Sequence, residues 1–136
     1  MDAFYRPWAD VKGERFDGFM ITGAPVETLN FKDVKYWPEL EEIFEWTATN
    51  VFSMFSICWG AQAALYHFNG VEKHRIDEVP KRFGVFDHRN LAPTHPLMQG
   101  IADVFEIPVS RHTENLRQDV EPIDGLTILA ENEVSG

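Results

Sequence analysis

Hydrophobic and polar positions follow two spacings along this chain, and these spacings predict strands and helices in alternation. Residues 16–22 (FDGFMIT) form a short apolar run, typical of a buried strand, that ends at a Gly-Ala-Pro break. Residues 36–49 are predicted to form a helix, because a proline suits its first turn and glutamates follow. Four residues fall on one face of this helix: Trp37, Leu40, Phe44 and Thr47.

A second strand and helix follow directly. Residues 51–57 are an apolar run of strand length, and the chain continues through Cys58 into a helical stretch over 59–68. Gly70 is placed as the stop of this helix. Further strands are predicted over 83–86, 104–107 and 126–130, separated by polar loops. This order predicts an α/β fold with a mostly parallel sheet and flanking helices.

Both ends of the chain lie close to predicted strands. Only residues 131–136 follow the last one, and a short stretch rich in aromatic residues leads into the first. An open parallel sheet usually has further strands, reached by right-handed crossovers. We therefore expect residues 1–136 to be the central part of a single larger domain.

Composition narrows the function classes. The 136 residues fit within one domain, and 12 Lys and Arg against 22 Asp and Glu give a net charge of −10. Nucleic acids and anionic membranes both require a basic surface, so neither is an expected partner. The single cysteine excludes a disulfide framework and favours a reducing cytoplasm. The sequence shows no secretion signal or membrane-spanning run.

The cysteine is the most informative residue. Cys58 is predicted at the carboxyl end of a strand and the start of a helix whose first turns are small residues. Sites in open α/β sheets lie at strand carboxyl ends. The helix dipole and the unpaired amides of the first turn favour a thiolate, and the Trp59 N–H is placed to hold an oxyanion. The alternative is a buried structural cysteine. Nothing in the sequence indicates a metal site, a phosphate-binding loop or a covalent cofactor.

Ordered motifs through most of the chain resemble the homoserine O-acyltransferases of methionine biosynthesis, a branch related to class I glutamine amidotransferases. The matching stretches are FDG at 16–18, TGAP at 22–25, YWP at 36–38, EW at 45–46, CWGAQAAL at 58–65, FGVF with His88 at 83–88, SRH at 110–112 and ILAE at 128–131. The resemblance implies an amidotransferase-like (flavodoxin-like) fold that is incomplete at both ends. It also implies that Cys58 is the nucleophile and forms an acyl-thioester.

A thiolate suits this chemistry. Attack on acyl-CoA exchanges one thioester for another, and the homoserine hydroxyl then attacks the acyl-enzyme with the help of a general base. Acetyl-CoA would be a co-substrate rather than a bound cofactor. His112-Thr113-Glu114 imitates the family's His-x-Glu pair, but it matches the SRH stretch upstream of that pair. We expect His67 to pack on the helix after Cys58 or to face solvent. His88 is expected to have a structural or substrate-shaping role, and His74 and His95 are expected to have no catalytic role.

In the family, the His-x-Glu pair that supplies the base and the arginine that grips the substrate carboxylate both come later in the sequence, so the resemblance implies that they lie outside residues 1–136. We therefore expect residues 1–136 alone to show no catalytic turnover.

The resemblance also assigns a role to Glu27. In the family, the residue two positions after the Ala-Pro pair tracks with the acyl donor: glycine accompanies succinyl-CoA and glutamate accompanies acetyl-CoA. Glu27 occupies this position. A succinyl carboxylate beside it would meet a like charge, so acetyl is the expected donor. Without the resemblance, Glu27 would be interpreted as a solvated loop residue.

Two more residues match positions that line the homoserine site. Lys81 could hold a carboxylate, and the Ser110 hydroxyl could orient the acceptor. The alternatives are a solvated lysine and a serine that caps a short helix. Arg111 could form a structural ion pair or contact CoA phosphates.

We thus expect a homoserine O-acetyltransferase whose substrates are L-homoserine and acetyl-CoA. A homoserine O-succinyltransferase is one alternative, and an amidotransferase-type hydrolase that releases ammonia from glutamine is another. A non-catalytic half-domain that acts only with a partner chain is the alternative from a different class. A homodimer is compatible with the resemblance.

Overall fold

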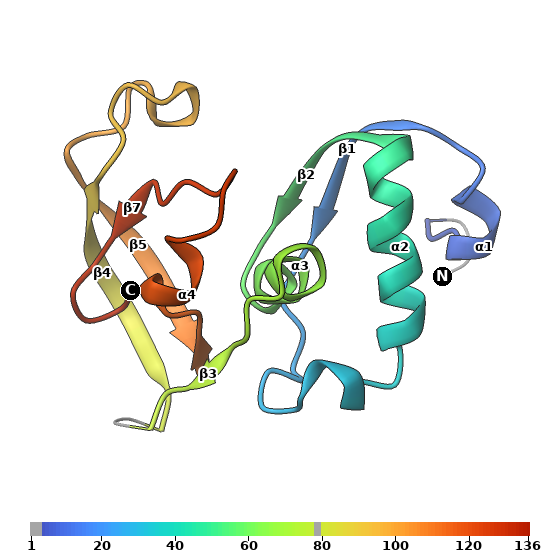
Figure 1. Cartoon of the computed structure of the whole chain (residues 1–136), viewed down its shortest axis with the longest axis horizontal. Coiled ribbons are helices and arrows are strands. Elements are labelled where there is room, and N and C mark those ends of the chain that lie inside the picture. Colours follow the sequence, from blue (N-terminus) through green and yellow to red (C-terminus); the bar gives the residue numbers. More distant parts are fainter. Residues whose placement is uncertain (1–3, 78–79) are drawn as a thin grey trace.

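The first half of the chain is built on a parallel strand pair. The computed structural model describes residues 4–77 and 80–136. After the short helix α1 (Trp8–Val11), strand β1 (Phe16–Ile21) pairs in parallel with β2 (Val51–Ser56). The connection runs through the 3₁₀ helix η1 (Phe31–Asp33) and helix α2 (Trp37–Asn50), and α3 (Trp59–Asn69) follows β2. Figure 1 shows this half on the right. The predicted strands and helices are confirmed here to within one residue at each end.

The core of this half lies where α2, α3 and η1 meet one face of the strand pair. The buried face of α2 consists of the four predicted residues, Trp37, Leu40, Phe44 and Thr47. Phe31 from η1 stacks on Tyr66 of α3 with ring centroids 4.6 Å apart. Gly70 ends α3 in the left-handed region (φ 70°), as predicted. Apolar burial on this face therefore fixes α3 beside the strands.

The opposite face of the strand pair is open within the part of the chain that the structure describes. Met20 and Phe55 are register partners, and they are 62% and 60% exposed. Large apolar side chains on adjacent strands are usually covered in a finished domain.

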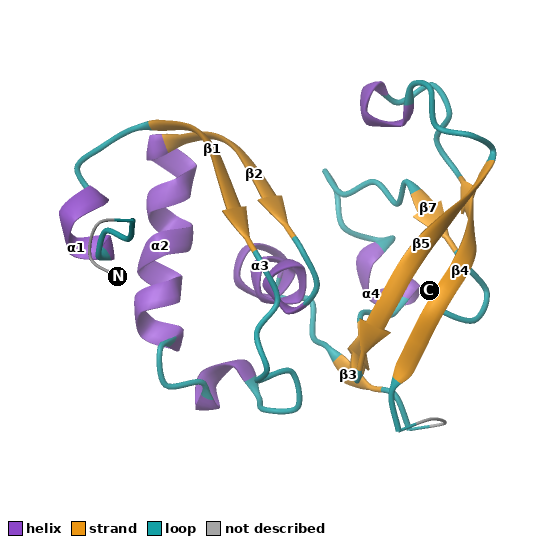
Figure 2. Ribbon diagram, turned by 180° about the vertical axis from the view of Figure 1, so that it is seen from behind, coloured by secondary structure: helices purple, strands orange, loops and turns teal. Residues whose placement is uncertain are grey.

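The second half is antiparallel, which corrects the prediction of a mostly parallel sheet. Strand β4 (Arg82–Asn90) pairs antiparallel with β5 (Val104–Arg111) and with β7 (Ala130–Glu131), and β3 (His74–Arg75) pairs antiparallel with β6 (Thr113–Glu114). Figure 2 shows β4 and β5 side by side from behind. A parallel crossover usually needs a helix, whereas residues 91–103 contain only the 3₁₀ helix η2 (Pro96–Met98). The chain therefore turns back on itself.

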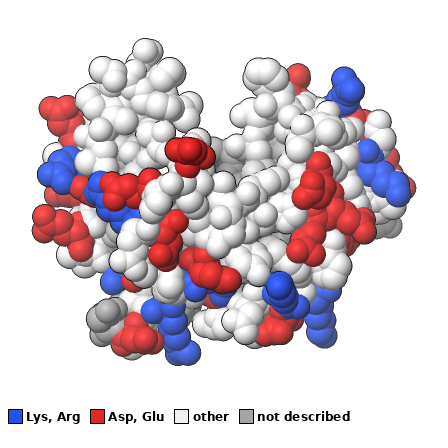
Figure 3. Space-filling view, in the orientation of Figure 1, with Lys and Arg blue, Asp and Glu red and all other residues white. Residues whose placement is uncertain are grey.

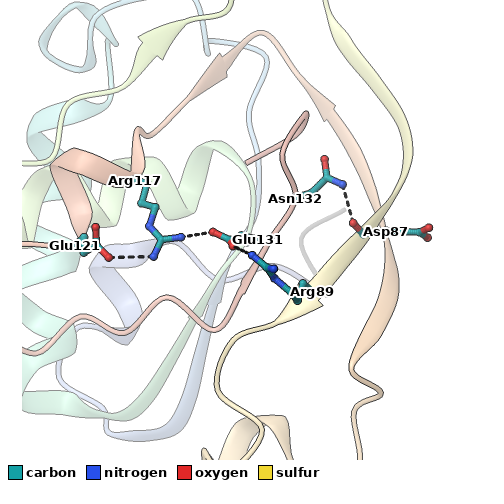
Figure 4. A network of polar contacts seen from close by, with 6 residues as sticks. All are labelled: Asp87, Arg89, Arg117, Glu121, Glu131 and Asn132. Carbon is teal, nitrogen blue, oxygen red and sulfur yellow. Dashed lines mark hydrogen bonds and ion pairs between the residues drawn. The ribbon is translucent and has the colours of Figure 1, made fainter.

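The strand predicted over 126–130 is much shorter than expected. Only Ala130 and Glu131 pair with β4, because β4 ends at Asn90 and leaves the preceding residues without a partner strand. The side chain of Glu131 holds this short strand in place, since it accepts hydrogen bonds from Arg89 of β4 and from Arg117 of helix α4 (Arg117–Val120). Figure 4 shows the network, in which Asn132 also donates to the Asp87 carbonyl. The hydrogen bond from Arg89 has the largest effect on the pKa of Glu131 and lowers it, and Arg117 lowers it further.

Charge is distributed over both halves. On the face in Figure 3, acidic side chains lie over each half with Lys and Arg interspersed among them. Of the helices within residues 4–77 and 80–136, none has the length and apolar character needed to cross a bilayer.

Candidate functional site

Cys58 occupies a strained turn between strand β2 and helix α3. Its backbone has φ 57° and ψ −126°, and it is the one non-glycine residue with positive φ among residues 4–77 and 80–136. Holding an L-residue there costs about 1–3 kcal/mol, and such strain gathers at functional sites. A strand–turn–helix with this geometry lifts the nucleophile out of the sheet. The Cys58 residue is exposed, so the buried structural alternative does not apply.

The two residues after Cys58 pack the start of α3 closely against its surroundings. A Cβ on Gly60 would lie 2.8 Å from the Thr22 carbonyl oxygen and 3.0 Å from Ile21 Cγ1, so only glycine fits this contact. Trp59 is 2% exposed and packs against Phe31 and Tyr36, with ring centroids 6.0 and 6.1 Å away. The turn is thus held by close packing on both sides of the helix.

The backbone amides at the start of α3 divide into those that close its first turn and one that has no partner within the helix. The Ala61 and Gln62 N–H groups donate to the Cys58 carbonyl, at 3.0 and 3.2 Å, and close the first turn of α3. The Trp59 N–H precedes them, at a position where a helix leaves its amides without an intrahelical partner. The loop after β1 lies next to the Trp59 amide, and a Cβ on Gly23 in this loop would be 3.8 Å from the Trp59 nitrogen. An oxyanion that forms on a substrate carbonyl would meet the Trp59 N–H here.

A cavity of about 160 Å³ opens at the thiol and joins the two halves of the structure. One wall comes from Cys58, Ala61, Gln62 and Glu27, and the other comes from Arg111, Thr113 and Asn115. The walls are tied together by the Thr113 hydroxyl, which donates to Gln62 Oε1 at 2.9 Å. The cavity therefore depends on residues more than 50 positions apart in the sequence.

Arg111 supplies the positive charge of this cavity. Burial lowers the pKa of its guanidinium most, while the negative charges of Glu114 and of the Cys58 thiolate raise it. Its Nε is buried without a hydrogen-bond partner. Within the described ranges, 4–77 and 80–136, it forms no ion pair, because Glu114 pairs with Arg82 instead. A guanidinium with free donors beside a thiol attracts both a thiolate and an anionic substrate group.

Gly23 is expected to be the glycine on which the thiol's position depends. An added Cβ would lie 3.2 Å from both Cβ and Sγ of Cys58, which is too close. We expect Gly23→Ala to slow alkylation of Cys58 about tenfold or more, because small displacements of a reacting group cost large factors in rate.

Timed labelling of the whole protein with iodoacetamide measures this rate. Gly13→Ala is the matched control, because nothing lies within 4 Å of a Cβ at that position. Equal labelling rates in the two variants would contradict the expectation.

The structure places the predicted site residues at different distances from the cavity. Glu27 lines it from the turn after β1, with a side chain 19% exposed. Lys81 is exposed just before β4 and does not line it. Ser110 lies in β5, opposite Phe83 and on the face away from Arg111, and it caps no helix. The roles predicted for Lys81 and Ser110 remain predictions.

The five histidines all have structural partners. His67 bonds to Glu45 at 2.8 Å and packs on Phe44, and His74 pairs with Asp119 at 2.7 Å. His95 accepts from the Leu97 N–H. His88 is buried between the Phe86 carbonyl and Ser135. None of these four lines the cavity, and nor does His112, which lies beside Glu27.

Comparisons with known proteins agree on one family. The family model described as "HTS: Homoserine O-succinyltransferase" matches residues 1–136. The chain is 54% identical over 134 residues to a homoserine O-acetyltransferase of Rhizobium leguminosarum bv. trifolii, covering 98% of this chain and 43% of that protein. It is 51% identical over 136 residues to a homoserine O-acetyltransferase of Novosphingobium aromaticivorans, covering 100% and 44%. The chain thus spans less than half the length of the curated relatives it matches.

Proposed function

Because this chain belongs to the homoserine O-succinyltransferase family, we propose that the whole protein transfers an acetyl group from acetyl-CoA to L-homoserine in methionine biosynthesis. The observation that carries the proposal is the strained Cys58 turn, which opens into a cavity lined by a half-buried arginine. The choice of acetyl-CoA rather than succinyl-CoA as the donor rests on Glu27 and on the names of the similar proteins.

The reaction takes two steps at Cys58. The thiolate attacks the carbonyl carbon of acetyl-CoA, the new C–S bond forms, and CoA leaves as its thiolate. The homoserine hydroxyl then loses its proton to a base and attacks the acetyl-enzyme, which releases O-acetylhomoserine and the Cys58 thiolate. The Trp59 N–H stabilises the oxyanion of each step. The Arg111 guanidinium lines the same cavity, where it can attract an anionic group of the substrate.

The resemblance to the family implies that the general base comes from a segment outside residues 1–136, and the cavity lining agrees with this. The residues that line the cavity within 4–77 and 80–136 include no histidine, and both nitrogens of the nearby His112 face other groups. We therefore infer that residues 1–136 by themselves do not turn over. Lys81 and Ser110 belong to the acceptor site of the whole protein on this proposal, by their match to the family's positions.

The whole domain has an amidotransferase-like sheet in this account. The parallel pair β1–β2, the cysteine turn and the open face with Met20 and Phe55 all fit a sheet that further segments extend and cover. A structure of the whole protein in which this face stays open to solvent would contradict it. A cytoplasmic location and a homodimer remain predictions from the sequence.

Product formation tests the reaction itself. The whole protein with acetyl-CoA and L-homoserine should release free CoA thiol and O-acetylhomoserine in equal amounts. Release of CoA without an acylated amino acid would show hydrolysis instead, and it would overturn the proposal.

Glu27→Gly is expected to raise the ratio of kcat/KM for succinyl-CoA to that for acetyl-CoA by at least about tenfold. A succinyl carboxylate about 4 Å from Glu27 would be repelled by up to ~4 kcal/mol at an effective dielectric constant of ~20. Solvent weakens this repulsion, but ~1.4 kcal/mol already gives a tenfold preference. Glu27 also fills volume that the longer acyl chain needs.

A competition assay with both donors and L-homoserine measures the ratio. Glu133→Gly, at an exposed residue away from the cavity, controls for the loss of one negative charge. An unchanged ratio in Glu27→Gly would contradict the assigned role.

A further inference from the structure

Two side chains from distant parts of the sequence hold the turn that carries Glu27. Lys73, in the segment after α3, donates hydrogen bonds to the backbone carbonyls of Glu27 and of Leu29, the latter at 2.6 Å. Its Nζ also lies 5.1 Å from the centroid of the Phe31 ring. Burial lowers the pKa of Lys73, and the negative charges of Glu27 and Glu72 oppose this effect. The backbone of the turn is thus anchored by a partly desolvated cation.

The Glu27 side chain has a separate partner. His112, between β5 and β6, contacts the Pro80 carbonyl through Nδ1 at 2.7 Å, and its Nε2 lies 3.4 Å from Glu27 Oε1. A carbonyl oxygen can only accept a hydrogen bond, so Nδ1 carries a proton. Nε2 then donates to the carboxylate when the ring is an imidazolium. With Nδ1 held by the Pro80 carbonyl, the ring has a fixed orientation in which Nε2 faces the Glu27 carboxylate.

We propose that His112 is a positioning residue that holds the Glu27 carboxylate at the edge of the Cys58 cavity and so sharpens the preference for the acetyl donor. This inference rests on the function proposed above, in which Glu27 excludes the succinyl carboxylate. A glutamate side chain has several rotatable bonds and would otherwise turn toward water, where its charge is screened. The Pro80 carbonyl fixes the imidazole, and the imidazole fixes the carboxylate.

An imidazolium at His112 also has an opposing electrostatic effect, because its positive charge partly neutralises Glu27. If neutralisation were the larger effect, removing His112 would strengthen the repulsion of succinyl-CoA. Position is the larger effect here, because His112 is half-buried and its side chain is 35% exposed, so solvent already screens its charge. The Arg111 charge stays in the cavity in every variant and does not alter the comparison.

Two substitutions at His112 separate the contact with Pro80 from the contact with Glu27. Asparagine places an amide N–H where Nδ1 lies, so His112→Asn keeps the contact with Pro80 and loses the contact with Glu27. Glutamine reaches the Nε2 position, so His112→Gln keeps a donor for Glu27. In the whole protein, His112→Asn should lower the preference for acetyl-CoA over succinyl-CoA about threefold to tenfold. His112→Gln should stay closer to the unaltered protein.

The readout is the product ratio when both donors compete for the same enzyme with L-homoserine present. Both donors compete for the same folded molecules, so partial unfolding of a variant cancels from the ratio. In a Glu27→Gly background, His112→Asn should change nothing further, because its effect passes through Glu27.

Equal shifts in His112→Asn and His112→Gln, a shift toward acetyl-CoA, or a further shift in the Glu27→Gly background would each overturn the inference. If Glu27→Gly shifts the ratio and His112→Asn does not, the inference alone fails. If Glu27→Gly itself leaves the ratio unchanged, the role of Glu27 fails and the inference fails with it.

Discussion

Replacing Cys58 by serine is expected to lower kcat/KM for acetyl transfer by at least about 10³-fold. The hydroxyl is protonated at neutral pH and is a far weaker nucleophile than a thiolate, and the first step would no longer exchange one thioester for another. The substitution keeps the backbone strain and nearly the same volume, so the loss belongs to the chemistry. Steady-state release of CoA thiol from the whole protein measures it.

Cys58→Gly supplies the matched control. Glycine adopts positive φ without the penalty that Cys58 bears at φ 57°, so this variant should be at least as stable as the unaltered protein and equally inactive. A serine variant that kept more than a tenth of the activity would remove Cys58 from the mechanism. A glycine variant clearly less stable than the unaltered protein would show that the turn is not strained.

Trp59→Ala is expected to lower the free energy of unfolding by about 3–5 kcal/mol. The indole is buried among Phe31 and Tyr36 and fastens the first turn of α3, so its removal leaves a cavity beside the nucleophile. Trp59→Phe should cost much less, because it keeps most of the ring contact. It also removes a buried indole Nε1 that has no hydrogen-bond partner.

Denaturant unfolding of the whole protein measures both variants. If the two substitutions cost the same, the ring contacts would not be what stabilises the turn. A cost below about 1 kcal/mol for Trp59→Ala would contradict the packing account, since it is less than burial of a small side chain contributes.

The sequence was sufficient to predict the parts of the structure that local signals determine. The buried face of α2 follows from the spacing of Trp37, Leu40, Phe44 and Thr47, and all four are buried. The start of α3 follows from the small residues after Cys58, and Gly70 ends the helix as its conformational freedom requires. Periodicity and capping act within a few residues, so the sequence displays them directly.

The sheet of the second half was predicted wrongly, because strand direction depends on connections. The apolar runs over 83–86 and 104–107 indicated two strands, but they did not show whether the strands run parallel or antiparallel. The 91–103 loop, with two prolines and no helical pattern, was the available signal for an antiparallel return. The short β7 depends on where β4 ends, and no local pattern shows that.

Arg111 is a cavity residue for which the sequence left two roles open, a structural ion pair or a contact with CoA phosphates. The predicted strand stopped at residue 107, whereas β5 continues to Arg111. Continuing its alternation places Phe105, Ile107, Val109 and Arg111 on one face, and Ser110 on the other. That alternation was the signal that could have placed Arg111 on the inward face of the strand. Its meeting with Cys58 still needed the fold, because the two residues come from separate halves.

The central claim is that Cys58 carries the acyl group, and its most direct test is the covalent intermediate. The whole protein is mixed with acetyl-CoA in the absence of homoserine, quenched in acid and digested, and the Cys58 peptide is weighed by mass spectrometry. The account predicts one added acetyl group on Cys58, which L-homoserine removes as O-acetylhomoserine, and no reaction with glutamine. An unmodified Cys58, or a glutamyl adduct formed with release of ammonia, would contradict it.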